Sequence, residues 1–318
     1  MKKILITGAC GQIGSELTTL LRERYGAENV IASDIKTEPS EDISDTGPYE
    51  ILDVRDRESL KKVVEKYSID TIYHMAAILS ATGEKNPQLA WDVNVNGLYN
   101  VLELAREKKL TRIFVPSSIA AFGPETPKKN TPQDTILKPR TIYGITKVIN
   151  ERLGEYYFWK YGLDVRGVRY PGIISYKTLP GGGTTDYAVE IFYEAIKHKK
   201  YTSFLKKDTR LPMMYMPDCL KATVTLMEAD ISRLRYHTDY NVASMSFSVE
   251  ELANEIKKHI PDFQIDYKPD FRQEIADSWP ESIDDTPARE DWNWSPDYDL
   301  SEMTVDMLDK ISKKLSSS

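Results

Sequence analysis

Apolar residues in the first half of the chain form short continuous runs that alternate with longer stretches of helical periodicity. Continuous runs are typical of strands buried on both faces, whereas apolar residues three and four apart mark one face of a helix. The candidate strands span residues 3–7, 30–33, 71–74, 112–116 and 165–168, and the candidate helices span 13–25, 59–67, 89–108 and 143–161. This alternation predicts a doubly wound α/β fold of the Rossmann type, with helices on both faces of a parallel sheet.

The pattern changes after residue 170. Glycines at 181–183 and frequent prolines interrupt shorter elements, and only one segment, at 240–243, resembles a strand that returns to the main sheet. We therefore expect residues 1–170 to form the dinucleotide-binding domain, with a returning strand near 237–243. Residues 171–318 should mostly form a smaller, interleaved lobe that binds the substrate.

Composition narrows the classes of partner. The 318 residues are 41% hydrophobic, enough for a large core, and the net charge of −7 provides no attractive field for nucleic acid. Cys10 and Cys219 are the only cysteines, so we expect no disulfide framework and a reducing, cytoplasmic location. The N-terminus lacks a signal peptide and no stretch is long enough to span a membrane. We see no metal-ligand spacing of His, Cys and carboxylates, so no metal is expected.

A glycine-rich turn follows the first strand and opens a helix. Glycines allow the backbone to turn tightly and to approach a pyrophosphate at the helix N-terminus. The turn alone is also compatible with an ordinary strand-to-helix loop, but its position between a strand and a helix favours dinucleotide binding. The residues expected at the cofactor here are Gly8, Cys10, Gly11, Gln12, Ile13 and Gly14.

Two carboxylates follow the next strands. Asp34 closes the second strand, at the interval where an acidic side chain accepts hydrogen bonds from the adenosine ribose, which favours NAD over NADP. Asp53, next to Val54, is a second candidate that would bind the adenine amino group. Either carboxylate could instead be an ordinary turn residue; this explanation is as good as the cofactor role for Asp53, whereas the position of Asp34 favours the cofactor.

Tyr143 and Lys147 begin a helix, and their spacing of four places them on one helix face. A phenol titrates near 10, so a base working near pH 7 needs a shift of roughly three units, which a nearby ammonium and a positive nicotinamide ring would supply. Ser118 follows the fifth strand at the edge of the sheet where ligands bind. Ser118 would then hold the substrate oxygen while Tyr143 removes its proton.

Together these motifs resemble the extended short-chain dehydrogenase/reductase family, which includes sugar-nucleotide epimerases, dehydratases and L-threonine 3-dehydrogenases. The matching segments are the glycine-rich turn, His74–Ala77, Asn94–Gly97, Ser118, and the pair Tyr143 and Lys147. The resemblance implies that Tyr143 is the catalytic acid/base, that Lys147 also binds the nicotinamide ribose, and that His74 is a packed residue. It also implies that Ala76, Ala77 and Asn94 line the cofactor, with Val54 and Tyr170 as further candidates.

The substrate prediction also follows from resemblance. Gly172 stands where sugar-nucleotide enzymes usually carry an asparagine, and the run 181–186 is similar to that of short-form L-threonine dehydrogenases. The likeness implies oxidation of L-threonine by NAD⁺ to 2-amino-3-oxobutanoate. The substrate contacts that it implies are Ser80, Ser118, Tyr143, Gly182, Thr184 and Thr185. Independently, the apolar spacing of the following helix places Thr184 or Thr185 near its N-cap, where glycine amides would meet a carboxylate.

Two other functions remain open: a sugar-nucleotide epimerase or dehydratase on the same scaffold, and a regulator that senses dinucleotides without chemistry. The helices near residues 86–108 and 141–161 carry more aromatic residues than one buried face needs, including Trp91 and Trp159. Because these helices pair between subunits in relatives, we expect a homodimer; alternatively, the aromatics cover the sheet.

Overall fold

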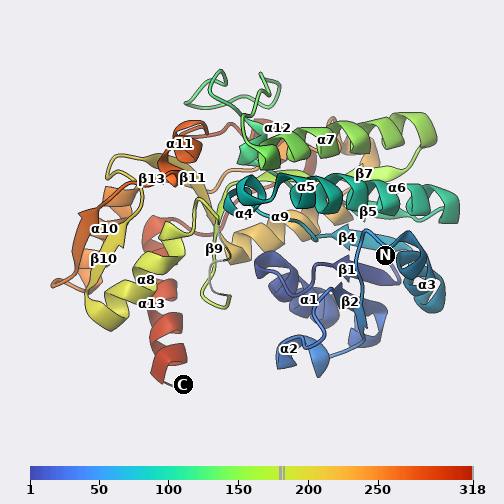
Figure 1. Ribbon diagram of the computed structural model, residues 1–318, viewed down its shortest axis with the longest axis horizontal. Helices are drawn as coiled ribbons and strands as arrows, with labels where there is room; N and C mark the ends of the chain where they lie inside the picture. The colour runs from blue at the N-terminus through green and yellow to red at the C-terminus, as the bar shows by residue number, and fades with distance from the viewer. Residues whose placement is uncertain (179–180, 182, 317–318) are drawn as a thin grey trace.

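The computed structural model describes residues 1–178, 181 and 183–316. Its centre is a six-stranded parallel sheet of strand order β3-β2-β1-β4-β5-β7 (Figure 1). The strands are β1 (Ile4–Thr7), β2 (Val30–Asp34), β3 (Tyr49–Ile51), β4 (Thr71–His74), β5 (Arg112–Phe114) and β7 (Asp164–Arg166). The strand order reverses between β1 and β4, which is where doubly wound sheets bind ligands. The predicted fold class is confirmed.

Three short strands extend this sheet at its carboxyl edge. β6 (Ser117–Ser118) continues from β5 and β8 (Val168–Tyr170) continues from β7, so that the two keep the same neighbours. β12 (Tyr240–Asn241) pairs in parallel with β8. The structure thus has a strand within the predicted segment 237–243, beside the last strand of the first domain.

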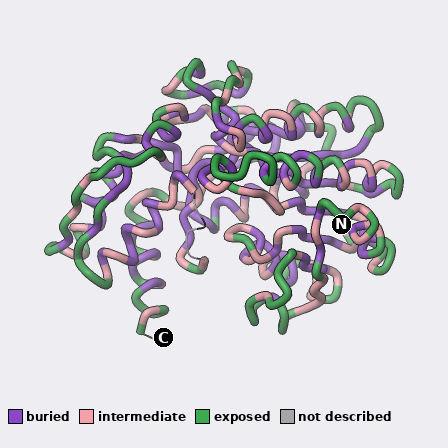
Figure 2. Tube along the Cα trace, in the orientation of Figure 1, coloured by how far each residue is buried: buried purple, intermediate pink, exposed green. Residues whose placement is uncertain are grey.

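Helices cover both faces of the central sheet. One face packs against α1 (Gln12–Tyr25) and α9 (Met216–Glu228), and the other against α3 (Arg57–Tyr67) and α6 (Gly97–Lys108), with α7 (Ile142–Tyr161) beside α6. Figure 2 shows the buried residues in the interior strands and along the inner sides of these helices. The short elements between them are η1 (Ala27–Asn29), α2 (Glu41–Ser44), α4 (Ser80–Lys85) and η3 (Ile119–Ala121).

The single helix predicted over residues 89–108 is wrong in detail. α5 (Pro87–Trp91) is separated from α6 by a π-helical segment, η2 (Asp92–Asn96). The wider turn accommodates Asn94, whose side chain is hydrogen-bonded to the backbone of Ile78 and to Thr146. Such a tertiary bond is invisible in the local apolar spacing, and π turns inside helices are frequent at functional sites.

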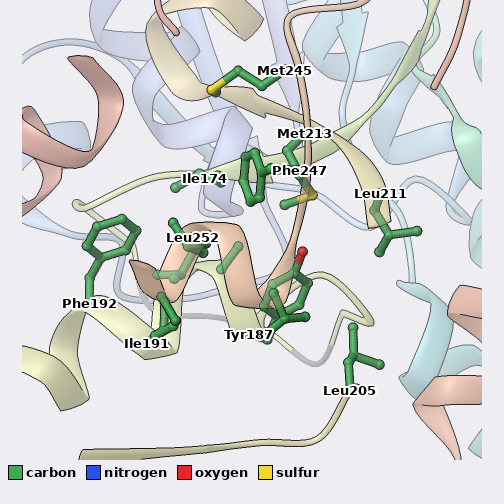
Figure 3. Close-up of a cluster of buried hydrophobic side chains, with 14 of the residues drawn as sticks. Ile174, Tyr187, Ile191, Phe192, Leu205, Leu211, Met213, Met245, Phe247 and Leu252 are labelled. Atoms are coloured by element: carbon green, nitrogen blue, oxygen red, sulfur yellow. The ribbon is translucent and has the colours of Figure 1, made fainter. Parts of the chain in front are cut away.

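The second lobe has its own sheets and core. β11 (Arg210–Tyr215) lies between β9 (Gly172–Ile174), in parallel, and β13 (Met245–Ser248), antiparallel, while β10 (Lys200–Ser203) pairs with β14 (Gln264–Tyr267). Side chains of α8 (Tyr187–His198) and α10 (Val249–His259) fill the core with those of β11 and β13 (Figure 3). The remaining elements are η4 (Ile231–Arg233), α11 (Arg272–Asp277), α12 (Thr286–Trp292) and α13 (Leu300–Ser316). α12 packs against the first domain, so the two lobes are interleaved.

No helix in the part of the chain that the structure describes is both long and apolar enough to cross a membrane. Over the same residues, no group of three or more His, Cys, Asp or Glu side chains is arranged to hold a metal ion.

Candidate active site

The glycine-rich turn between β1 and α1 is shaped by close backbone contacts. Gly8 has a φ of 69°, and a Cβ atom at Gly8 would lie 2.5 Å from the amide nitrogen of Ala76. A Cβ atom at Gly14 would lie 2.2 Å from the carbonyl oxygen of Gly8. Neither position therefore tolerates a side chain. The N-cap of α1 is Gly11, which gives no side-chain hydrogen bond, so the first amides of the helix are open to an anion.

Asp34 lies beside this turn. Its Oδ2 accepts a hydrogen bond from the Cys10 amide (2.9 Å) and its Oδ1 accepts one from the Lys36 amide (3.3 Å). These bonds fix the half-buried carboxylate at the carboxyl end of β2, beside the glycine-rich turn. The residues present therefore fit a dinucleotide with free ribose hydroxyls.

Asp53 is engaged differently. Its carboxylate forms an ion pair of 2.6 Å with Arg55, which holds the pKa of Asp53 below its usual value. The neighbouring Val54 is buried, and a Cβ atom at Gly97 would come within 2.7 Å of its Cγ2. The assignment of Asp53 and Val54 to the adenine end of the cofactor stays a prediction.

The loop after β4 forms one wall of the cleft. Met75 and Ala77 line it, whereas Asn94 lies behind the loop with 2% of its surface exposed. Asn94 Oδ1 accepts from the Ile78 amide (2.8 Å), and Asn94 Nδ2 donates to the Ile78 carbonyl (3.0 Å). Both ends of its amide therefore hold the loop in place, and the assignment of Asn94 to the cofactor stays a prediction. Ala76 approaches Gly8, as described above.

His74, at the end of β4, is a packed residue as expected. It is buried, its Nδ1 lies 3.0 Å from Thr7 Oγ1, and burial together with the charge of Lys147 lowers its pKa to about 3. The imidazole is therefore neutral.

The structure brings Ser118, Tyr143 and Lys147 together in this same cleft. Thr141 caps α7 by accepting a hydrogen bond from the Gly144 amide, which fixes the start of the helix that carries Tyr143. Lys147 Nζ donates to the Pro116 carbonyl (2.7 Å) and lies 5.3 Å from the centre of the Tyr143 ring. Ser118 is the last residue of β6, and its hydroxyl is hydrogen-bonded to that of Tyr143. The predicted triad thus has the geometry to act on one substrate oxygen.

In the ligand-free protein the pKa of Tyr143 is raised, whereas the sequence analysis expected Lys147 and the nicotinamide ring together to lower it. Burial raises the pKa of Tyr143 to about 12, although a hydrogen bond with Ser118 opposes the increase. Burial also lowers the pKa of Lys147 to about 8, opposed by the charge of Glu151. An acidic phenol is therefore absent before ligands bind, because desolvation of the ring outweighs the nearby ammonium.

A network of buried polar side chains links the segments that carry Ser118 and Lys147, and the sequence analysis did not predict it. Ser117 Oγ donates to Glu151 Oε1 (2.5 Å), and Glu151 forms an ion pair with Arg169 on β8 (2.9 Å). Asp239 also contacts Arg169, at 3.1 Å. Glu151 follows Lys147 by one helical turn, and Ser117 precedes Ser118, so both catalytic segments are tied to each other. The spacing of Lys147 and Glu151 was the only local signal for this network.

The far end of the cleft is lined by Ser80, Thr184 and Thr185, whose contact with a substrate stays a prediction, and by Gly183 and Asp186. Ser80 Oγ and Thr184 Oγ1 lie 3.4 Å apart, which joins α4 to the loop before α8. Gly182 lies outside the described residues.

Thr184 and Thr185 lie directly before the N-cap of α8, as the apolar spacing predicted. The N-cap of α8 is Asp186, and its Oδ2 accepts a hydrogen bond from the Gly183 amide (2.7 Å). The Gly183 amide, which was expected to meet a substrate carboxylate, therefore already contacts a carboxylate of the protein. Apolar spacing could not distinguish Thr185 from Asp186 as the cap because both are good cap residues.

Tyr170 and Trp279 complete the lining. Tyr170 lies in the wall as predicted, with its hydroxyl hydrogen-bonded to Thr223 on α9. Trp279 was missed, because it reaches the cleft from a loop more than a hundred residues away from the triad. Lys128 Nζ donates to the carbonyl oxygens of Asp277 (2.6 Å) and Trp279 (2.8 Å), which holds this loop. The family likeness around Trp279 was the one available signal.

Comparison with known proteins agrees with this geometry. The sequence pattern of the NAD dependent epimerase/dehydratase family matches residues 4–243. An uncharacterized epimerase/dehydratase of Staphylococcus haemolyticus is 54% identical and aligns over 99% of both chains. The L-threonine dehydrogenase of Clostridium difficile is 54% identical with a TM-score of 0.96, over 99% of this chain and 98% of its own. A monomeric L-threonine 3-dehydrogenase from a metagenome is 52% identical with a TM-score of 0.94, over 98% and 99%.

The fold and the cleft define a dinucleotide-dependent enzyme. The chain belongs to the NAD dependent epimerase/dehydratase family, and its cofactor is NAD. The resemblance predicted from the sequence and the NAD prediction are confirmed. Solved structures that are similar to this chain over nearly its whole length include those of L-threonine dehydrogenases.

Proposed function

We propose that this enzyme oxidises L-threonine at its β-carbon with NAD⁺, giving 2-amino-3-oxobutanoate, NADH and a proton, as a step of threonine catabolism. The observation that carries the proposal is a single cleft in which Ser118, Tyr143 and Lys147 lie between the glycine-rich turn and a small polar end. The similarity to L-threonine dehydrogenases over nearly the whole chain supports this choice of substrate.

The roles of the three residues follow from their chemistry. Ser118 holds the β-hydroxyl group of the substrate by a hydrogen bond, and Tyr143 accepts the hydroxyl proton on its phenolate oxygen. Lys147 stabilises the phenolate by its charge and contacts the nicotinamide ribose. When bound, NAD⁺ supplies the acceptor for the hydride that leaves the same carbon. The carbon is thereby oxidised to a ketone.

The polar end of the cleft suits an amino-acid head group. The hydroxyls of Ser80, Thr184 and Thr185 can donate to a carboxylate, and Asp186 adds a negative charge that favours a substrate ammonium. The contact between Ser80 and Thr184 places two of these hydroxyls 3.4 Å apart, close enough to bind one small head group together. Gly182 is proposed as a further contact from its sequence position alone.

Absorbance of NADH after mixing the protein with NAD⁺ and L-threonine tests the proposal. Tyr143→Phe should abolish turnover but keep NAD binding. Tyr267→Phe, the same change on β14 of the second lobe and outside the cleft, is the matched control and should leave turnover intact. Absence of NADH formation by the wild type, with turnover of a UDP-sugar instead, would establish the rival epimerase or dehydratase. NAD binding without any turnover would indicate the regulator.

We also propose that the enzyme is a homodimer that pairs through α6 and α7. Large apolar side chains are exposed along these helices and the preceding α5, and the side chain of Trp159 is the most exposed of them, at 76%. The members of this patch are Leu89, Trp91, Tyr99, Tyr156, Trp159 and Tyr161. Exposed apolar patches of this kind are typical of interfaces. Because one similar enzyme is described as monomeric, the mass of the protein in solution decides this point.

A further inference from the structure

Two side chains lie close to Gly172 at the position that a Cβ atom would take, those of Thr185 and Met213. A Cβ atom built on Gly172 would lie 2.6 Å from Cγ2 of Thr185 and 2.5 Å from Sδ of Met213, distances that real Cβ atoms essentially never show. Gly172 opposes Met213 in the pairing of β9 with β11, and both Gly172 and Thr185 line the cleft. The methyl group of Thr185 therefore occupies space that any side chain at position 172 would need.

This contact fixes the direction of the Thr185 hydroxyl. A β-branched side chain carries its methyl and hydroxyl groups on the same carbon, so placing the methyl group against Gly172 also places the hydroxyl. Among the described residues, the Thr185 hydroxyl has no hydrogen-bond partner, and the residue is only half-buried. The hydroxyl is thus available to a ligand. Thr184 is instead already in contact with Ser80.

We propose that Gly172 is a specificity-determining residue: its missing side chain lets Thr185 pack against β9 and present its hydroxyl to the head group of a small β-hydroxy amino acid. The proposal rests on the proposed function and adds a residue that acts on the substrate through Thr185. A side chain at position 172 would displace Thr185 from β9. It would leave the cofactor end unchanged, because Gly8, Gly14 and Asp34 lie on other elements.

The first test is Gly172→Ala. The KM for threonine should rise roughly tenfold or more, because one hydrogen bond to a charged group is misplaced, while the dissociation constant for NADH stays the same. Gly162→Ala is the matched control: it adds the same methyl group at the C-cap of α7, outside the cleft, where nothing lies within 4 Å of the new Cβ atom. The control should keep the wild-type KM.

The second test is rescue. Thr185→Ser keeps the hydroxyl and removes Cγ2, so the double variant Gly172→Ala, Thr185→Ser should have the KM of Thr185→Ser alone. If the double variant has the KM of Gly172→Ala, the added methyl acts through Met213 and the proposal is wrong. An unchanged KM for Gly172→Ala would overturn it as well.

Thermal unfolding shows whether Gly172→Ala folds. If it does not fold, Thr185→Val tests the same hydroxyl with little change in shape, and an unchanged KM for threonine would refute the proposal. No threonine turnover by the wild type contradicts the proposed function and this proposal together, whereas normal wild-type turnover with an unaffected Gly172→Ala contradicts this proposal alone.

Discussion

Replacement of Lys147 by Met removes the charge that is proposed to make Tyr143 acidic. The ammonium lies 5.3 Å from the centre of the Tyr143 ring. At this distance and an effective dielectric constant of about 20, a phenolate and an ammonium attract by about 3 kcal/mol, which is about two pKa units. The variant should therefore need a pH about two units higher to ionise Tyr143.

The assay is the pH dependence of kcat with saturating NAD⁺ and threonine, so that any weaker cofactor binding is overcome. Activity requires the phenolate and rises with pH, so the midpoint of the rise should move up by about two units and low-pH rates should fall roughly 100-fold. Lys147→Arg keeps the charge and should keep the midpoint near its wild-type position. An unchanged midpoint in Lys147→Met, with only weaker NAD binding, would show that Lys147 serves the cofactor and not the phenol.

Three further changes test other parts of the structure. Asp34→Asn keeps an oxygen for the Cys10 amide but removes the charge, so preference for NAD over NADP in fluorescence titrations should fall; an unchanged preference would exclude Asp34 from the ribose site. Glu151→Gln should lower the free energy of unfolding in urea by about 3 kcal/mol, because the buried Arg169 loses an ionic partner, and a change no larger than that of the surface variant Glu155→Gln would contradict this. Trp159→Glu should halve the mass measured by light scattering, and a wild-type mass of one chain would refute the dimer.

The parts of the fold that depend on local patterns were predictable. Buried strands such as β1 and β4 need continuous apolar runs, and the turn at Gly8 and Gly14 needs glycine for steric reasons that hold in any protein. Tyr143 and Lys147 are one helical turn apart, so their meeting follows from helix geometry alone. The cytoplasmic location and the extents of the two domains stay predictions.

The parts that depend on distant contacts were not predictable. The π turn at Asn94 exists where that side chain binds the backbone at Ile78, and Trp279 enters the cleft through its contact with Lys128. The high pKa of Tyr143 arises from the burial of its ring, which sequence spacing does not report. Family likeness identified several cleft residues, but it did not indicate that Asn94 holds the loop after β4 through its two bonds to Ile78.

The most direct measurement of the central claim uses L-threonine that carries deuterium on its β-carbon. Mass spectrometry of the reduced cofactor formed with the wild-type protein should show one deuterium atom per NADH, and Tyr143→Phe should form neither labelled nor unlabelled NADH. NADH without deuterium would contradict hydride transfer from the β-carbon to NAD⁺. Undiminished turnover by Tyr143→Phe would contradict the role of Tyr143 as the base.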